Sequence, residues 1–101
     1  MVEARFDETI HAPVRLRICG LLRQVDQLDF AVLRDSLKVS DATLSKHLKI
    51  LATSGYVISS KAASEGRSDA RRITWLTLTR TGQSAFDAHI HALQQIAGTS
   101  A

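Results

Sequence analysis

The stretch SDATLSKHLKILATSGYV, residues 40–57, sorts its side chains into two opposite sets when it is read as a helix. At 3.6 residues per turn, Leu44, Leu48 and Leu51 form one narrow apolar stripe. The other face is small, polar or cationic and comprises Ala42, Thr43, Ser45, Lys46 and Lys49. Small side chains let a helix approach base edges, while lysines and hydroxyls bind phosphates or base acceptors. This face therefore predicts a contact with the major groove of double-stranded DNA.

Positive charge is concentrated in the part of the chain that begins with this stretch. The chain carries 13 Lys and Arg against 10 Asp and Glu, for a net charge of +3. Residues 1–39 are neutral overall, residues 40–80 hold seven basic and three acidic side chains, and residues 81–101 hold one acidic side chain. A local cationic surface is what a polyanion partner requires. Chance scatter of the basic residues is the alternative that the charge map alone leaves open.

Few other residues have types and spacing that could support catalysis or metal binding. There is no glycine-rich phosphate loop and no nucleophile paired with a base, so we expect no enzyme activity, catalytic residue or cofactor. The single Cys19 excludes an internal disulfide and a multi-cysteine metal site, and its simplest role is that of a small buried hydrophobe. In the segment DAHIH, Asp87 and His91 stand at i, i+4 spacing and could share a metal ion. Sensing by Cys19 or by this segment remains an alternative to a structural role.

Length and composition indicate one folded domain. A chain of 101 residues with 45% hydrophobic and 23% charged residues can build one modest core and is too short for two. No apolar run approaches the roughly 20 residues that span a bilayer, and the first residues lack the apolar stretch of a signal peptide. We therefore expect no membrane contact and a cytoplasmic, nucleoid-associated location.

The elements that would position the outward face follow from hydrophobic spacing and capping residues. Pro13 and the apolar residues after it predict a first main helix over about 13–25, preceded by a short helical turn near 7–11. A second helix, barely two turns long, lies within residues 31–40. A tight connection then leads to Ser40, which suits the N-cap of the third helix, and Gly55 is placed to end that helix.

After Gly55 the pattern changes to that of strands. YVISSKAA and ARRITWLTLT are rich in β-branched and aromatic residues, and the polar turn SEGRSD between them predicts a hairpin. Its basic residues Arg67, Arg71 and Arg72 are candidates for DNA contact. Arg67 at the turn is the better one, because strand alternation sends Arg71 and Arg72 to opposite faces.

The last segment predicts a helix over about 80–97. Phe86, Ile90 and Leu93 recur at helical spacing, which favours a dimer seam or packing against the first helix. The order of elements predicts an α+β, mainly helical fold, a winged helix-turn-helix with a two-stranded wing and a C-terminal dimerisation helix. We expect one domain over 1–101, with the helix-turn-helix at about 31–54 and the wing at about 57–78.

At these residues the chain resembles ArsR-like and MarR-like transcriptional regulators, and most of all small single-domain winged-helix regulators of bacteria and archaea. The resemblance covers roughly residues 7–95 and rests on HAPVRLRI, LDFAVLRDSL, the LSKHL that follows Ser40, and the wing motifs Gly66-Arg67, Thr74-Trp75 and Leu78-Thr79-Arg80-Thr81-Gly82. It implies a homodimer, paired through the first and last helices, on a pseudo-palindromic operator. Ser68-Asp69-Ala70 departs from the further basic residues and proline of many relatives, so the contact at the wing tip rests mainly on Arg67.

The resemblance also bears on the metal alternative. Some ArsR-like sensors begin a zinc site on the last helix with Asp-x-His, as in Asp87-x-His89 here. Their remaining ligands follow about three turns later, where this sequence reads IAGTSA. Half of that ligand set is therefore missing, and we expect no metal.

Together these features predict a sequence-specific regulator that binds double-stranded DNA as a dimeric repressor. Thr43, Lys46, Lys49 and Arg67 would contact phosphates, and Ala42 and Ser45 would read bases with help from one of the two lysines. His47 is expected at the rim of the core. The alternatives are a winged-helix adaptor that binds protein instead of DNA, and a metal-responsive regulator. The operator sequence and any small-molecule effector cannot be read.

Overall fold

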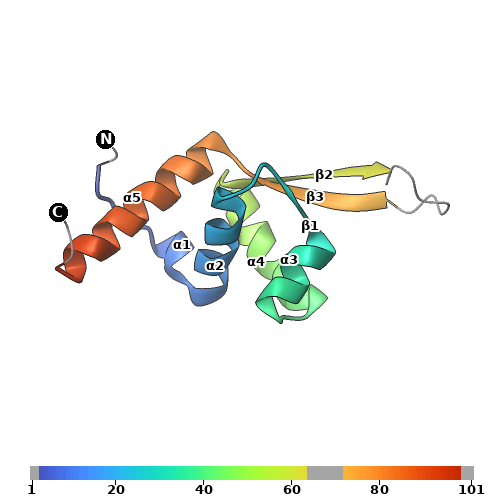
Figure 1. Ribbon diagram of the computed structural model, residues 1–101, viewed down its shortest axis with the longest axis horizontal. Coiled ribbons are helices and arrows are strands. Elements are labelled where there is room, and N and C mark those ends of the chain that lie inside the picture. Colours follow the sequence, from blue (N-terminus) through green and yellow to red (C-terminus); the bar gives the residue numbers. More distant parts are fainter. Residues whose placement is uncertain (1–2, 64–71, 99–101) are drawn as a thin grey trace.

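The computed structural model describes residues 3–63 and 72–98. The elements in chain order are α1 (Glu8–His11), α2 (Pro13–Arg23), β1 (Leu28–Asp29), α3 (Phe30–Leu37), α4 (Asp41–Thr53), β2 (Val57–Ala63), β3 (Arg72–Leu78) and α5 (Arg80–Ile96). Helices α1 to α4 gather into one body, from which β2 and β3 project on one side and α5 extends on the other (Figure 1). The molecule is elongated, with extents of 52 × 26 × 22 Å. The α+β, mainly helical winged helix-turn-helix is confirmed.

Side-chain caps fix where the helices begin. The hydroxyl of Ser40 accepts from the backbone N–H of Thr43 at 3.1 Å, which confirms Ser40 as the N-cap of α4. Helix α2, in contrast, ends at Arg23, two residues before the expected end. The backbone N–H of Gln24 bonds to carbonyls in the last turn, and the chain then leaves toward β1. Val25 lies outside the helix as a result and is 44% exposed.

The helix-turn-helix is closed by two residues in the left-handed conformation. Lys38 ends α3 with φ 58°, and Gly55 follows α4 with φ 79°. After α4, the N–H of Gly55 bonds to the carbonyl of Ala52 and that of Tyr56 to the carbonyl of Leu51, both at 2.9 Å. This pair of bonds is a Schellman motif, so the expected left-handed cap at Gly55 is confirmed.

The sheet has three antiparallel strands in the order β1-β3-β2. The two strands of the predicted hairpin are present, with β2 and β3 paired from Val57 opposite Leu78 to Ala63 opposite Arg72, and the predicted turn SEGRSD lies outside the described residues. The third strand was not predicted: β1 pairs Leu28 with Leu76. A strand of two residues has no periodicity of its own, and its partner lies far along the sequence. The sheet therefore anchors the wing to the helical body.

The leucine stripe of α4 is the centre of the core. Leu44 and Leu51 are fully buried and Leu48 is 8% exposed. They pack with the other members of the buried apolar cluster, which are Ile10, Ile18, Cys19, Leu22, Leu33, Leu37, Val57, Leu76 and Leu78. Burying one face of α4 fixes the direction of the other, so the core determines which side chains α4 presents to a partner.

The base of the wing is held by a close contact between two backbones. The hydroxyl of Thr79, the N-cap of α5, donates to the carbonyl of Gly55 at 2.7 Å and accepts from the N–H of Gly82 at 2.9 Å. A Cβ at Gly82 would overlap the carbonyl oxygen of Tyr56. The end of α4 and the start of α5 therefore meet at a junction that only glycine fits.

Within the described ranges, none of the helices is both long and apolar enough to cross a membrane.

Candidate nucleic-acid interface

The outward face of α4 consists of the residues that the sequence singled out. Ala42, Ser45, Lys46 and Lys49 are exposed, and Thr43 is half-buried. They lie on the helix that buries Leu44, Leu48 and Leu51 on its other side. The face is free of large apolar groups and carries two lysines one turn apart. This is the composition that a helix needs to enter the major groove.

The first turn of α4 is ordered by a reciprocal contact between two hydroxyls. Ser40 accepts from the N–H of Thr43 and donates its own proton to Oγ1 of Thr43 at 2.9 Å. The hydroxyl proton of Thr43 is thereby left available for an acceptor. Free backbone N–H groups and the helix dipole make this end of the 13-residue helix suited to an anion such as a phosphate.

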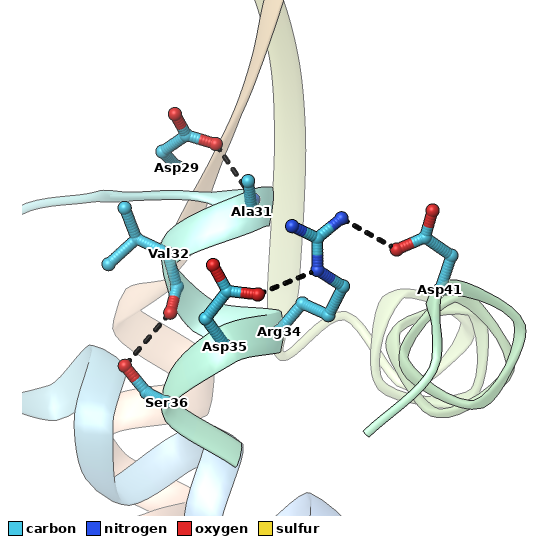
Figure 2. Close-up of polar contacts among 7 residues, drawn as sticks. All are labelled: Asp29, Ala31, Val32, Arg34, Asp35, Ser36 and Asp41. Atoms are coloured by element: carbon cyan, nitrogen blue, oxygen red, sulfur yellow. Dashed lines mark hydrogen bonds and ion pairs between the residues drawn. The ribbon is translucent and has the colours of Figure 1, made fainter. Parts of the chain in front are cut away.

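A guanidinium connects α3 to the first turn of α4 (Figure 2). Nε of Arg34 donates to Asp35 and an Nη donates to Asp41, each at 2.9 Å. The hydrogen bonds to these carboxylates, that of Asp35 first, raise the pKa of Arg34. Asp41 would otherwise place an unpaired negative charge at the N-terminal end of α4. Arg34 offsets that charge and ties the two helices together.

Sequence reasoning missed the contact between Arg34 and Asp41, although these two residues flank the predicted turn. The one sequence signal is that an arginine in the last turn of the second helix and an acid at the first position of the third stand on either side of the tight turn. Figure 2 also shows why α3 starts where it does, since the carboxylate of Asp29 accepts from the N–H of Ala31 at 2.8 Å. The unpredicted start at Phe30 follows from this cap.

His47 lies half-buried at the rim of the core, as expected. Its Nδ1 faces a guanidinium nitrogen of Arg15 at 2.9 Å. Arginine can only donate, so this ring nitrogen is the acceptor and carries no proton. Burial, followed by the charges of Arg15 and Lys46, lowers the pKa of His47. His47 is therefore a neutral structural side chain and adds no positive charge to the outward face of α4.

A cleft of about 240 Å³ separates α4 from the sheet. Its rim is polar, with Ser45 and Lys49 from α4 and Ser59 and Thr74 from the strands. Its floor is apolar and is made by Phe30, Leu48, Val57 and Leu76. The cleft joins the outward face of α4 and the near face of the wing into one surface.

The basic residues of the wing are only partly within the described structure. Lys61 on β2 is exposed. Arg67 and Arg71 lie outside the described residues, and of Arg72 only the backbone in β3 is described. Their contact with DNA stays a prediction.

The residues of α5 divide between packing and exposure. Phe86, Ile90 and Leu93 are half-buried, and the ring of Phe86 packs over Gly20 of α2. Near the end of the helix Ile96 is 73% exposed. Phe86 thus fills the packing role that was one of the two expectations for these residues, and their part in a dimer remains a prediction.

The candidate metal ligands of α5 point to different surroundings. Asp87 forms a bidentate pair with Arg23 at 2.9 and 3.0 Å. His89 is fully buried, and its Nδ1 accepts from the backbone N–H of Asp7. Across residues 3–63 and 72–98, no three His, Cys, Asp or Glu side chains are grouped so that they could hold a metal ion. Burial raises the pKa of Cys19 to about 12, which makes its thiol a poor nucleophile.

A helix with a small, cationic outer face, preceded by a tight turn and followed by a wing, is the geometry of a known family. The family described as a winged helix DNA-binding domain matches residues 14–97. The chain belongs to this family. DNA is the partner that the family implies, and the family is typical of transcriptional regulators, which are not enzymes.

This winged-helix domain is similar in sequence to one archaeal protein and in fold to solved transcriptional regulators. It is 31% identical over 83 residues to an uncharacterized protein of Methanocaldococcus jannaschii, covering 82% of this chain and 86% of that one. Its fold resembles that of a transcriptional regulator homologue from Pyrococcus horikoshii OT3, with a TM-score of 0.82, 21% identity, and coverage of 91% of this chain and 87% of that one. A mutant of Lactococcus lactis ZitR in apo form gives a TM-score of 0.66 at 24% identity, with 87% of this chain and 62% of that one covered. The resemblance to MarR-like and ArsR-like regulators is confirmed.

Proposed function

We propose that the chain is a sequence-specific transcriptional regulator that binds double-stranded DNA as a homodimer and represses by occupying its operator. The observation that carries this proposal is the outward face of α4, where Ala42, Ser45, Lys46 and Lys49 are exposed opposite a buried leucine stripe. A winged helix that binds protein would instead present an apolar patch there, and none of these four side chains is a large hydrophobe.

The residues of the face divide into two roles. Thr43, Lys46 and Lys49, with Arg67, Arg71 and Arg72 of the wing, bind phosphates and supply most of the affinity. Ala42 and Ser45 are small and exposed in the first turns of α4, where base edges come within reach, and they discriminate between sequences. The polar rim of the cleft between α4 and the sheet accommodates the sugar-phosphate strand that runs between helix and wing.

The homodimer is formed through α5, with Ile90 and Leu93 at its centre. Both side chains are half-buried in one chain, and Ile96 beyond them is 73% exposed, so this side of the helix offers apolar surface to a second copy. Ile90→Glu should convert the dimer to a monomer in sedimentation velocity while the far-UV spectrum is retained. A variant that stays dimeric would place the interface elsewhere.

DNA fragments selected from the source genome at moderate salt, followed by titration in fluorescence anisotropy, test the proposal. Lys49→Ala should weaken binding to all sequences and reduce the slope of log K against log salt by about 0.9, because one phosphate contact is lost. Ser45→Ala should change the ranking of sites. Arg5→Ala is the matched control, since it removes one exposed positive charge beside α5 and should leave both properties unchanged. If neither α4 variant differs from the control, α4 is not the reading helix.

A further inference from the structure

His89 of α5 is buried, and the hydrogen bonds of its ring depend on which ring nitrogens carry a proton. It is the only polar or charged residue in the described ranges that is buried, with 0% of its surface exposed. Its Nδ1 accepts from the backbone N–H of Asp7 at 2.9 Å, and its Nε2 lies 3.2 Å from Nδ1 of His11. The ring of Phe6 covers both imidazoles, with centroid distances of 4.7 Å to each.

These contacts allow only one arrangement of protons. A backbone N–H can only donate, so Nδ1 of His89 carries no proton and the neutral ring is protonated at Nε2. That Nε2–H then donates to His11, whose Nδ1 is also without a proton. A proton added to Nδ1 of His89 would oppose the N–H of Asp7, and one added to Nδ1 of His11 would oppose Nε2–H of His89. The contacts therefore exist only while both rings are neutral.

The titratable and charged groups around His11 and His89 do not remove the requirement that both rings be neutral. The carboxylate of Asp7 accepts from the hydroxyl of Tyr56 at 2.6 Å and from the N–H of Ile10 at 3.1 Å. Burial first, and then the charge of His11, lowers the pKa of His89, and Asp7 opposes this more weakly. The hydrogen bond to Asp7 raises the pKa of Tyr56 to about 12, so this phenol keeps its proton. On the α2 side the nearby groups are Cys19, which also stays protonated, and Arg15, and the N-terminal segment adds Arg5.

Helix α1 links the histidine contact on α5 to helix α4. The carbonyl of Thr9 in α1 accepts from Nε of Arg15 at 2.6 Å, and the same guanidinium donates to Nδ1 of His47 at 2.9 Å. The short helix is thus tied to α5 by His11 and His89 and to α4 through Arg15. A shift of α1 would change the support of the helix that presents Lys46 and Lys49.

We propose that His11 and His89 form a proton-sensitive clasp that holds the segment 3–11 against α5 while both rings are neutral, and that opening of the clasp weakens DNA binding through Arg15 and His47. The second half rests on the proposed function, and the first half does not. Mild acid is then a signal that releases the operator.

Nuclear magnetic resonance of the histidine rings and backbone amides tests the clasp without DNA. At pH 7.5, long-range proton–nitrogen spectra should show His89 protonated at Nε2 only. On acidification the amide of Asp7 should shift, and its hydrogen exchange should accelerate, with the same midpoint as the His89 ring. A His89 ring protonated at Nδ1 at pH 7.5, or an Asp7 amide that ignores the titration, would overturn the clasp.

DNA titrations between pH 7.5 and 5.5 test the coupling. The affinity of the wild-type chain should fall with acid, approaching tenfold per pH unit where one proton must be lost before binding. In His89→Asn an amide oxygen can take the N–H of Asp7 without titrating, so the loss should shrink to that of the background. His11→Gln, at an exposed position, should also flatten the profile and serves if His89→Asn does not fold. His91→Gln is the control from the same helix and should keep the wild-type profile.

The two proposals fail in different ways. A wild-type chain that binds no selected fragment at pH 7.5 would defeat the proposed function, and the ring and amide spectra would still decide the clasp. Equal pH dependence of DNA affinity in the wild type, His89→Asn and His11→Gln would defeat the coupling while leaving DNA binding intact.

Discussion

Two helical glycines offer a matched test of the junction that holds the wing. Gly82 lies in the first turn of α5, and a Cβ there would overlap the carbonyl oxygen of Tyr56. Gly20 lies inside α2, and a Cβ there would meet only the ring of Phe86, at 3.7 Å, an ordinary contact distance. The same change, glycine to alanine, should therefore have opposite effects at the two positions.

The expected magnitudes follow from this difference. Gly20→Ala should stabilise the fold by about 0.5–1 kcal/mol, because alanine loses less conformational freedom in a helix interior. Gly82→Ala gains part of the same entropic stabilisation, but its Cβ pushes the backbone of α5 away from the carbonyl of Tyr56. Overpacking of this kind costs about 1–3 kcal/mol. A net loss on the order of 1–2 kcal/mol lowers Tm by roughly 5–15 °C in a domain of this size.

Urea and thermal unfolding of both variants, followed by circular dichroism at pH 7.5, measure the two effects. DNA titration of the same samples reports on the wing: Gly82→Ala should weaken binding even at temperatures where it is folded, because the displaced junction moves β2 and β3 relative to α4. Gly20→Ala should bind as the wild type does. If Gly82→Ala is as stable as Gly20→Ala, the backbones at the junction are not in contact and the wing is held in another way.

Three further predictions concern the core, the first turn of α4 and the buried His89. Leu44→Ala should destabilise the fold by about 2–5 kcal/mol in urea unfolding, since this side chain is fully buried. Asp41→Asn should increase DNA affinity and steepen its salt dependence, because Arg34 becomes available to phosphate, whereas Asp26→Asn, the control at an exposed loop position, should change neither. The contribution of His89 to the free energy of unfolding should be constant above about pH 6.5 and fall below it, because the lowered pKa of His89 lets the unfolded chain take up the proton before the folded chain does. His89→Asn should reduce that fall, and an unchanged profile would contradict the assignment.

The helix-turn-helix could be predicted because its signals are local. Ser40, the leucine stripe and Gly55 lie within one continuous segment, and each can be recognised from residue type and spacing within that segment. The strand β1 and the early end of α2 could not be predicted in the same way. Leu28 belongs to a strand only because Leu76 is there to pair with it. Val25 has the right spacing for the apolar stripe, but the helix stops before reaching it.

The residues of the candidate DNA interface divide in the same way, into those that could be predicted from local signals and those that could not. Exposure of Lys46 and Lys49 follows from helical periodicity once the leucines are assigned to the core. The contact of Arg34 with Asp41 crosses the turn, so its two ends belong to different helices and neither periodicity includes it. Arg15 is more distant still, since it joins α1 to α4 from α2. Each of these contacts depends on the packing of helices, which a pattern within one segment does not contain.

The motif DAHIH shows how the packing decides between two chemistries. Asp87 and His89 are two residues apart, so on a helix at about 100° per residue their side chains diverge by roughly 200°. Asp87 accordingly meets Arg23 at the surface, while His89 enters the interior, where Asp7 and His11 arrive from the other end of the chain. A pair that looks like the start of a metal site is thus separated by the helix itself. What makes His89 functional in our proposal is its protonation, and that is set by a backbone N–H that lies 82 residues away in sequence.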